Sequence, residues 1–161
     1  MADVRPLHVP PNGGVPNHPR WPALILPGVA PADIGADGAR ALVRRNGWGG
    51  DWLYTVFDYH HFHPDAHEAL LCVAGRATLR LGGPEGETLE IGPGDGLILP
   101  AGFGHKRERG SADFAVVGAY PPGQESPRIL RAGDEFEEDL AALPAPERDP
   151  FDTRPFPAEW A

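Results

Sequence analysis

The sequence predicts a single all-β domain, built as a sandwich or barrel, with two short helices outside it. Between residues 48 and 124, short apolar segments alternate with turn residues every eight to twelve positions. No helical segment separates these strands, which argues against a parallel sheet of βαβ units. Sixteen of the 20 prolines lie in residues 1–31 or 121–161, so the flanks are irregular. We expect an N-terminal arm with a short helix over 1–47, a barrel over 48–124, and an acidic C-terminal arm with a helix over 125–161.

The N-terminal arm contains one apolar run and one helical pattern. Residues 23–26 read Ala-Leu-Ile-Leu between two prolines, which predicts an edge strand and excludes a central one. Residues 33–45 place Ile34, Ala41 and Leu42 on one face. Asp33 is suited to cap the start of this helix, and Asn46-Gly47 is suited to end it.

The barrel region contains at least six predicted strands. Alternation is longest in the first of them, and the Gly-rich segment 82–86 predicts a turn after the third. A final helix over 134–143 is predicted from Phe136, Leu140 and Leu143 on one side, with Asp134 and Glu137 resembling a capping box. The predicted strands cover residues 52–63, 68–74, 77–81, 88–91, 97–99 and 114–120.

Composition excludes several classes of protein. The net charge is −9, and residues 121–161 contribute −6 of it with 10 acidic and 4 basic side chains. With Lys106 as the one lysine, a surface that follows a phosphate backbone, and hence a nucleic-acid partner, is not expected. No apolar run has the roughly 20 residues of a membrane helix, and the first residues lack the apolar centre of a signal peptide. One cysteine, Cys72, excludes an internal disulfide framework. We expect a soluble cytoplasmic protein.

Histidine is concentrated in one short segment. Four of the seven histidines lie in residues 60–67, and Glu68 follows at once. In an extended chain, His61 and His63 point to one face and His60 to the other. A turn at Pro64 brings Glu68 back toward that first face on the neighbouring strand. Two imidazoles and a carboxylate in this arrangement suit Mn, Fe, Co, Ni or Zn.

A second segment adds one more ligand candidate. GDGLILPAGFGH, residues 94–105, ends a strand in a Pro/Gly turn with His105 just beyond it. That turn is suited to place His105 as a fourth ligand.

The two segments together resemble the paired motifs of the cupin superfamily. HFHPDAHEALLCVAG has the spacing of the first motif, with His61, His63, Glu68 and Gly75 at its fixed positions. GDGLILPAGFGH has the spacing of the second, with Gly94, Pro100, Gly102 and His105. The strings HHFHPDAHEAL, PAGFGHK and VGAYPPGQ are similar to the YjlB-like group of small bacterial single-domain cupins. The chain departs from the usual motifs at Thr55, where a glycine is common, and at Arg109, where an asparagine is common.

The resemblance implies a fold and a metal site. It implies one double-stranded β-helix, the RmlC-like jelly-roll barrel, holding one divalent transition metal (Fe, Mn, Ni or Zn) through His61, His63, Glu68 and His105. Four protein ligands on a six-coordinate ion leave two positions for a small molecule. Similar proteins exchange strands in dimers, so a homodimer is expected.

Two functions stay open from the sequence. The first is a small-molecule metalloenzyme of dioxygenase, isomerase or decarboxylase type, and the second is a non-catalytic cupin that binds a sugar or an organic acid. Tyr59, Arg107 and Arg109 are candidate substrate contacts, the tyrosine beside the barrel mouth and the arginines for an anionic group. His67 is either a proton carrier or a residue that fixes the turn, and His60 either supports a dimer contact or packs on the sheet.

Overall fold

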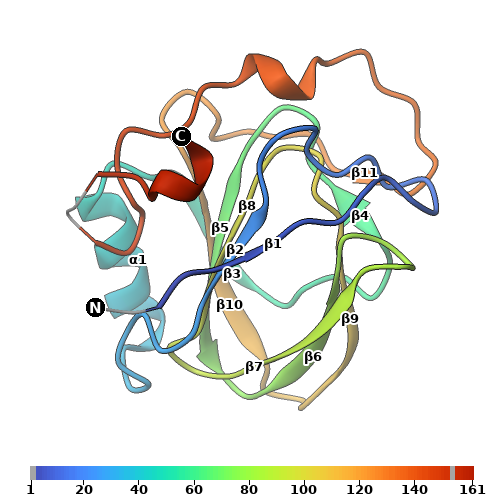
Figure 1. Cartoon of the computed structure of the whole chain (residues 1–161). Coiled ribbons are helices and arrows are strands. Elements are labelled where there is room, and N and C mark those ends of the chain that lie inside the picture. The colour runs from blue at the N-terminus through green and yellow to red at the C-terminus, as the bar shows by residue number, and fades with distance from the viewer. Residues whose placement is uncertain (1–2, 153–154) are drawn as a thin grey trace.

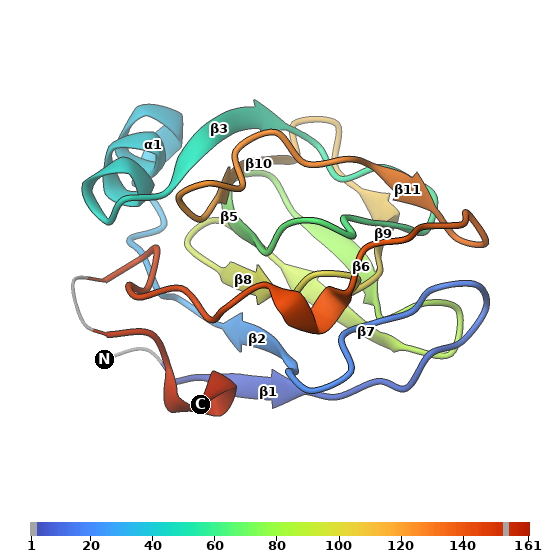
Figure 2. The same ribbon diagram turned by 90° about the horizontal axis from the view of Figure 1, so that it is seen from above.

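Two antiparallel sheets face each other in a computed structural model that describes residues 3–152 and 155–161 (Figures 1 and 2). This arrangement confirms the predicted all-β class. One sheet has six strands, in the order β1 (Arg5–Leu7), β2 (Ala23–Leu26), β8 (Gly96–Leu99), β5 (Glu68–Ala74), β10 (Ala115–Tyr120) and β3 (Gly49–Tyr54). The other has five, in the order β11 (Leu130–Arg131), β4 (His61–Phe62), β9 (His105–Gly110), β6 (Ala77–Leu81) and β7 (Glu87–Ile91).

The main core lies between the two sheets. Alternation along β5 sends Leu70 and Cys72 inward, where they meet Leu79 and Leu81 from β6. All four side chains are fully buried. The core fills one end of the barrel and leaves the other end for the polar residues at the starts of β4, β5 and β9.

The six-stranded sheet is also covered on its outer face. Helix α1 (Gly35–Arg45) and residues of the C-terminal arm pack there against the outward residues of β2, β5, β8 and β10 (Figure 1). Trp160 is buried in this layer and donates its indole N–H to the Pro22 carbonyl at 2.8 Å. Strands β2 and β8 are buried on both faces, and they are therefore apolar throughout apart from Gly96.

Two sequence expectations in the N-terminal arm are corrected. The strand at 23–26 is not an edge strand, because it pairs with β1 on one side and β8 on the other. Its flanking prolines lie just outside the paired residues, so the ladder loses no donor. Helix α1 begins at Gly35, with Ile34 as its N-terminal flanking residue and no side-chain cap, so Asp33 does not cap it.

The predicted strand over 52–63 is two strands in different sheets. β3 ends at Tyr54, and β4 begins at His61 on the opposite sheet. Between them the chain crosses the barrel mouth, and the Phe57 carbonyl accepts a hydrogen bond from the Arg107 amide at 2.8 Å.

The predicted helix over 134–143 is absent from the described part of the chain, where only a 3-10 turn, Leu140–Ala142, forms. Asp134 accepts a hydrogen bond from the Arg131 amide at 2.8 Å, which is a turn and not a capping box. Within the described ranges, no helix is both long enough and apolar enough to cross a membrane.

Candidate metal centre

The strand pairing brings the two histidine segments together. His61 of β4 and His105 of β9 are direct register partners, and their ring centroids lie 4.0 Å apart. His63 follows β4, and its carbonyl accepts a hydrogen bond from the Gly102 amide at 2.8 Å. Gly102 has a φ of +85°, and a Cβ there would lie 2.6 Å from Leu140, so the turn before His105 requires glycine.

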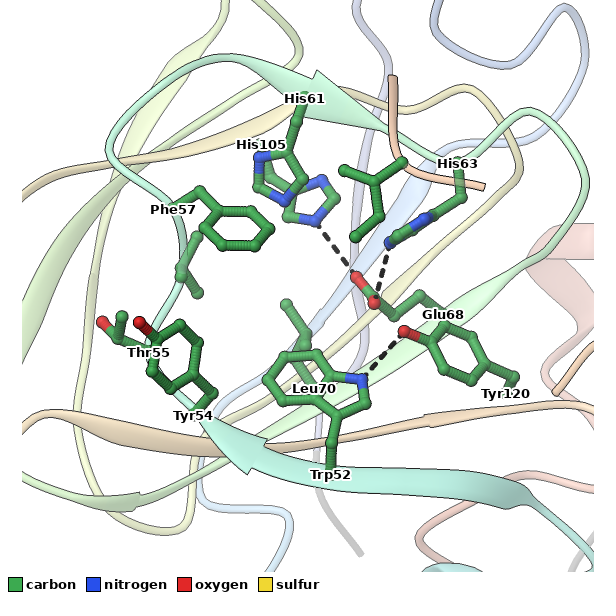
Figure 3. Close-up of a pocket in the computed structure, with 12 residues that line it drawn as sticks. Trp52, Tyr54, Thr55, Phe57, His61, His63, Glu68, Leu70, His105 and Tyr120 are labelled. Atoms are coloured by element: carbon green, nitrogen blue, oxygen red, sulfur yellow. Dashed lines mark hydrogen bonds and ion pairs between the residues drawn. The ribbon is translucent and has the colours of Figure 1, made fainter. Parts of the chain in front are cut away.

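Glu68 reaches this group from the opposite sheet, at the start of β5 (Figure 3). Its Oε2 lies 3.0 Å from His63 Nε2, and its Oε1 lies 3.1 Å from His105 Nε2. Donor atoms of His63, Glu68 and His105 all lie within 4.8 Å of one another. Glu68 is 2% exposed, and apart from this ion-pair contact with His105 its Oε1 has no hydrogen-bond partner among the described residues. A buried carboxylate is stable only when a positive charge lies beside it.

All three histidines have the same second contact. Each Nδ1 lies at hydrogen-bonding distance from a backbone carbonyl, which can only accept, so each Nδ1 carries the proton. In a neutral ring the Nε2 then keeps its lone pair, as in histidines that bind metals through that atom. For His61, His63 and His105 in turn, the carbonyls are those of Tyr59 (3.1 Å), Arg128 (2.8 Å) and Phe103 (3.2 Å).

Charge within the group is strongly coupled. Burial alone would raise the pKa of Glu68, but the charge of His63 and the contacts with both imidazoles hold it well below its ordinary value. Burial opposes protonation of His63, but Glu68 more than offsets this and raises the pKa of His63. Burial, followed by the neighbouring His105, lowers the pKa of His61 to about 2. His61 is therefore neutral at any physiological pH.

His61 stands apart from the other three predicted ligands. It is buried and packs against His105, but its donor atoms are not among those that lie within 4.8 Å of one another. The structure therefore brings together His63, Glu68 and His105, with His61 beside them as the fourth residue of the predicted set.

The group lies at the bottom of a cavity of about 280 Å³ (Figure 3). Trp52 crosses the cavity wall and donates its indole N–H to the Tyr120 hydroxyl at 2.8 Å. Burial and the nearby Glu68 carboxylate raise the pKa of Tyr120, so its phenol stays neutral. The lining residues are Trp52, Tyr54, Thr55, Val56, Phe57, His61, His63, Glu68, Leu70, His105, Tyr120 and Ile129.

The three predicted substrate contacts do not line this cavity. The Tyr59 ring stacks on Phe57 at 5.1 Å and lies under the Arg131 guanidinium at 3.9 Å. Arg107 donates from its Nε to the Val56 carbonyl at 3.1 Å. Arg109 is exposed on β9, 3.8 Å from a carboxylate of β7. A role of these three in substrate binding stays a prediction.

His67 is engaged on both ring nitrogens. Its Nδ1 accepts from the Ala101 amide at 3.0 Å, and its Nε2 donates to the Pro144 carbonyl at 3.1 Å. It therefore fixes the turn and fastens the C-terminal arm. His60 is half-buried, and no hydrogen-bond partner of its buried Nδ1 is found in the described part of the chain.

Sequence reasoning missed most of the cavity wall. Trp52, Tyr54, Tyr120 and Ile129 come from three separate segments and have no motif in common. One signal was available for Trp52: its register partner on β10 is Gly118, and a Cβ there would lie 2.2 Å from the indole. A glycine within an apolar strand indicates that another group packs closely against the backbone there. The sequence does not identify that group, because the pairing of β10 with β3 is known only from the structure.

Comparisons with known proteins identify relatives. No family model matches the chain. It is 38% identical over 141 residues to the uncharacterized protein YjlB of Bacillus subtilis, covering 84% of each chain. It is 29% identical over 109 residues to quercetin 2,3-dioxygenase of the same organism, which covers 68% of this chain but 30% of that enzyme.

Solved structures match less of the chain. The 3,4-ketoisomerase QdtA from Thermoanaerobacterium thermosaccharolyticum, in complex with TDP, has 20% identity and a TM-score of 0.38, covering 45% of this chain and 58% of its own. Acireductone dioxygenase from Bacillus anthracis, with a cadmium ion in its active centre, has 17% identity and a TM-score of 0.39. The match covers 57% of this chain and 62% of that enzyme.

Proposed function

The chain belongs to the cupin superfamily, in the group of YjlB, and on this premise we propose that it is a metalloprotein acting on a small molecule. In this proposal His63, Glu68 and His105 hold one divalent transition metal, and His61 supplies the fourth donor. Fe, Mn, Ni and Zn all accept this combination of imidazole and carboxylate ligands.

One observation carries the proposal: a buried carboxylate lies between two Nε2 atoms whose partner Nδ1 atoms are already committed to carbonyls. Such a cluster has an excess of lone pairs and is stable only with protons or a cation among them. His63, Glu68 and His105 would hold such an ion through their imidazole and carboxylate donors, which lie within 4.8 Å of one another. The contacts of Glu68 with His63 and His105, at 3.0 and 3.1 Å, bring these donors into one group.

The metal would supply Lewis-acid or redox chemistry at the end of the cavity. The chain's own residues do the rest. The three backbone carbonyls orient the imidazoles, and Trp52 and Tyr120 form a hydrogen-bonded pair beside Glu68 (Figure 3). The apolar wall excludes water from the ligand's reacting end, which strengthens electrostatic contacts there. Dioxygenation, isomerisation and decarboxylation are all compatible with this site, and the similarity to quercetin 2,3-dioxygenase favours the first.

A specific observation favours a second candidate function, non-catalytic binding of a small molecule. Glu68 is the one carboxylate among the described residues that line the cavity, and it is itself a proposed metal ligand, so no further carboxylate is available there for proton transfer. Metal-dependent product formation in a screen of small acids, polyols and phenols would remove this candidate. A homodimer and a cytoplasmic location stay predictions.

The test of the metal site is elemental analysis of anaerobically purified protein. We expect one divalent metal per chain in the wild type and a loss of at least tenfold in occupancy in Glu68→Gln and His105→Ala. His60→Ala is the matched control, since His60 adjoins His61 but does not line the cavity, and it should retain the metal. His61→Ala should weaken binding by a smaller factor. Full occupancy in Glu68→Gln would refute the proposed site.

A further inference from the structure

We propose that the cavity takes an uncharged molecule built on an aromatic ring, with a hydroxyl or carbonyl oxygen directed at the His–Glu centre. The placing of the oxygen rests on the function proposed above. The placing of the ring does not, because it follows from the wall alone.

The wall is apolar and largely aromatic. Trp52, Tyr54 and Phe57 surround the hollow, and Leu70 lies behind it (Figure 3). Tyr54 and Phe57 contact each other edge to face, with centroids 6.3 Å apart. Aromatic side chains attract a further ring through stacked and edge-to-face contacts, beyond the area that the ring buries. A flat aromatic ligand therefore suits this wall better than a saturated one.

Positive charge is absent from the wall. None of the described lining residues is a lysine or an arginine. Three arginines close to it in the chain or the fold are engaged elsewhere: Arg107 donates to the Val56 carbonyl, Arg131 covers the ring of Tyr59, and Arg128 pairs with Glu138. A phosphate or carboxylate on the ring portion of a ligand would lose its hydration and gain no partner. The wall thus selects against anionic groups.

The rim has apolar side chains that are exposed to solvent. Tyr54 is 61% exposed and Ile129 is 52% exposed, and both line the cavity. They come from β3 and from the segment before β11, at edges of the two sheets. A ligand ring bound between them would cover this apolar surface, and exposed apolar surface of this kind is typical of binding sites.

The cavity is large enough for an aromatic ligand. A dry cavity of about 150 Å³ lined by aliphatic and aromatic side chains is known to bind benzene. The volume here, about 280 Å³, is roughly twice as large. It accommodates one ring with its oxygen substituents and has room for a second fused ring.

The test compares probes that differ in one property. Binding of catechol, cyclohexane-1,2-diol, phenyl phosphate and naphthalene-2,3-diol to the zinc-loaded protein is measured by calorimetry at several temperatures, with zinc content checked afterwards. Naphthalene-2,3-diol should bind about as tightly as catechol, and we expect catechol to bind at least tenfold more tightly than cyclohexane-1,2-diol or phenyl phosphate. Its binding should also have a negative heat-capacity change, the mark of apolar burial. Equal or tighter binding of phenyl phosphate or cyclohexane-1,2-diol would overturn the proposal.

Two matched variants locate the ring. Ile129→Glu places a charge on the rim and should weaken catechol binding at least fivefold. Leu53→Glu places the same charge on a residue that is 43% exposed and does not line the cavity, and it should change affinity less than twofold. Equal effects of the two variants would contradict the proposed ring position.

A further measurement distinguishes failure of the metal site from failure of the ring site. Phenol binding is also measured on the metal-free protein, where the ring portion of the proposal predicts weaker but detectable binding that Ile129→Glu reduces. A protein that takes up no zinc but binds phenol in this way would refute the metal site and leave the ring site standing. Zinc uptake without any preference for aromatic probes would do the reverse.

Discussion

Gly118→Ala is the sharpest perturbation that the cavity wall offers. Gly118 lies on β10 opposite Trp52, and the indole lies across it. An added Cβ would lie 2.2 Å from Cζ2, 2.3 Å from Cε2 and 2.7 Å from Nε1 of that indole. One methyl group therefore forces the Trp52 ring away from its place, and with it the hydrogen bond to the Tyr120 hydroxyl.

The expected cost has two parts. Overpacking of a well-filled site costs about 1–3 kcal/mol. Loss of the Trp52–Tyr120 hydrogen bond adds about 1 kcal/mol. The free energy of unfolding should thus fall by about 2–4 kcal/mol, and at about 2–4 °C per kcal/mol for a chain of this size the Tm should fall by about 4–16 °C.

The assay is thermal unfolding followed by circular dichroism and by tryptophan fluorescence. Gly49→Ala is the control, since Gly49 also lies in the β3–β10 pair and a Cβ there meets only Glu125 Cγ at 3.6 Å. That variant should be neutral or stabilising by up to about 1 kcal/mol, because alanine restricts the unfolded chain. A Tm of Gly118→Ala within 2 °C of wild type would refute the packing argument, as would an equal loss in Gly49→Ala.

Three further outcomes are expected. Tyr120→Phe leaves the Trp52 indole N–H without its acceptor and should lower the free energy of unfolding by about 1–3 kcal/mol in urea titrations. Burial lowers the pKa of His18 to about 4, so below a pH of about 6.5 the unfolded chain binds a proton at His18 that the folded chain does not bind. The free energy of unfolding should therefore fall, as the pH falls, by up to about 1.4 kcal/mol per pH unit. In His18→Gln the urea midpoint should depend less on pH between 7 and 4.5. Chelation should lower the Tm of metal-loaded wild type and leave Glu68→Gln unchanged, since a ligand at 100 times its Kd stabilises by about 2.7 kcal/mol.

The fold was predictable where local pattern and pairing agree. The predicted strands over 68–74 and 77–81 match β5 and β6 in full, because alternation and turn residues mark both of their ends. The prediction over 52–63 is wrong because alternation continues while the chain changes sheets, and hydrogen bonds from Arg107 to the crossing segment carry no sequence signal. The prediction over 134–143 is wrong because Phe136 packs against Phe62 at 5.6 Å and holds the chain in an irregular path.

The candidate site was predictable in its polar part only. Motif spacing singled out His63, Glu68 and His105, and the structure brings their donor atoms together. The apolar wall could not be found in this way, because Trp52 and Ile129 are separated by 77 positions and meet only after both sheets form. Spacing identifies residues joined by one turn or one hairpin, whereas a wall made of three segments depends on the whole topology.

The outer face of one sheet is packed and that of the other is exposed, and this difference determines where the protein tolerates substitutions. The central strands of the six-stranded sheet are packed on both faces, so a new side chain almost anywhere along β5 or β8 must displace a neighbour. The five-stranded sheet turns Arg80, Glu108 and Glu90 toward water, where ion pairs such as Arg80–Glu108 at 2.6 Å contribute little to stability. In a saturation library, permissive positions should cluster on the outward residues of β6, β7 and β9. Those positions are also the places to attach a fluorophore or a surface tether without disturbing the cavity on the other side.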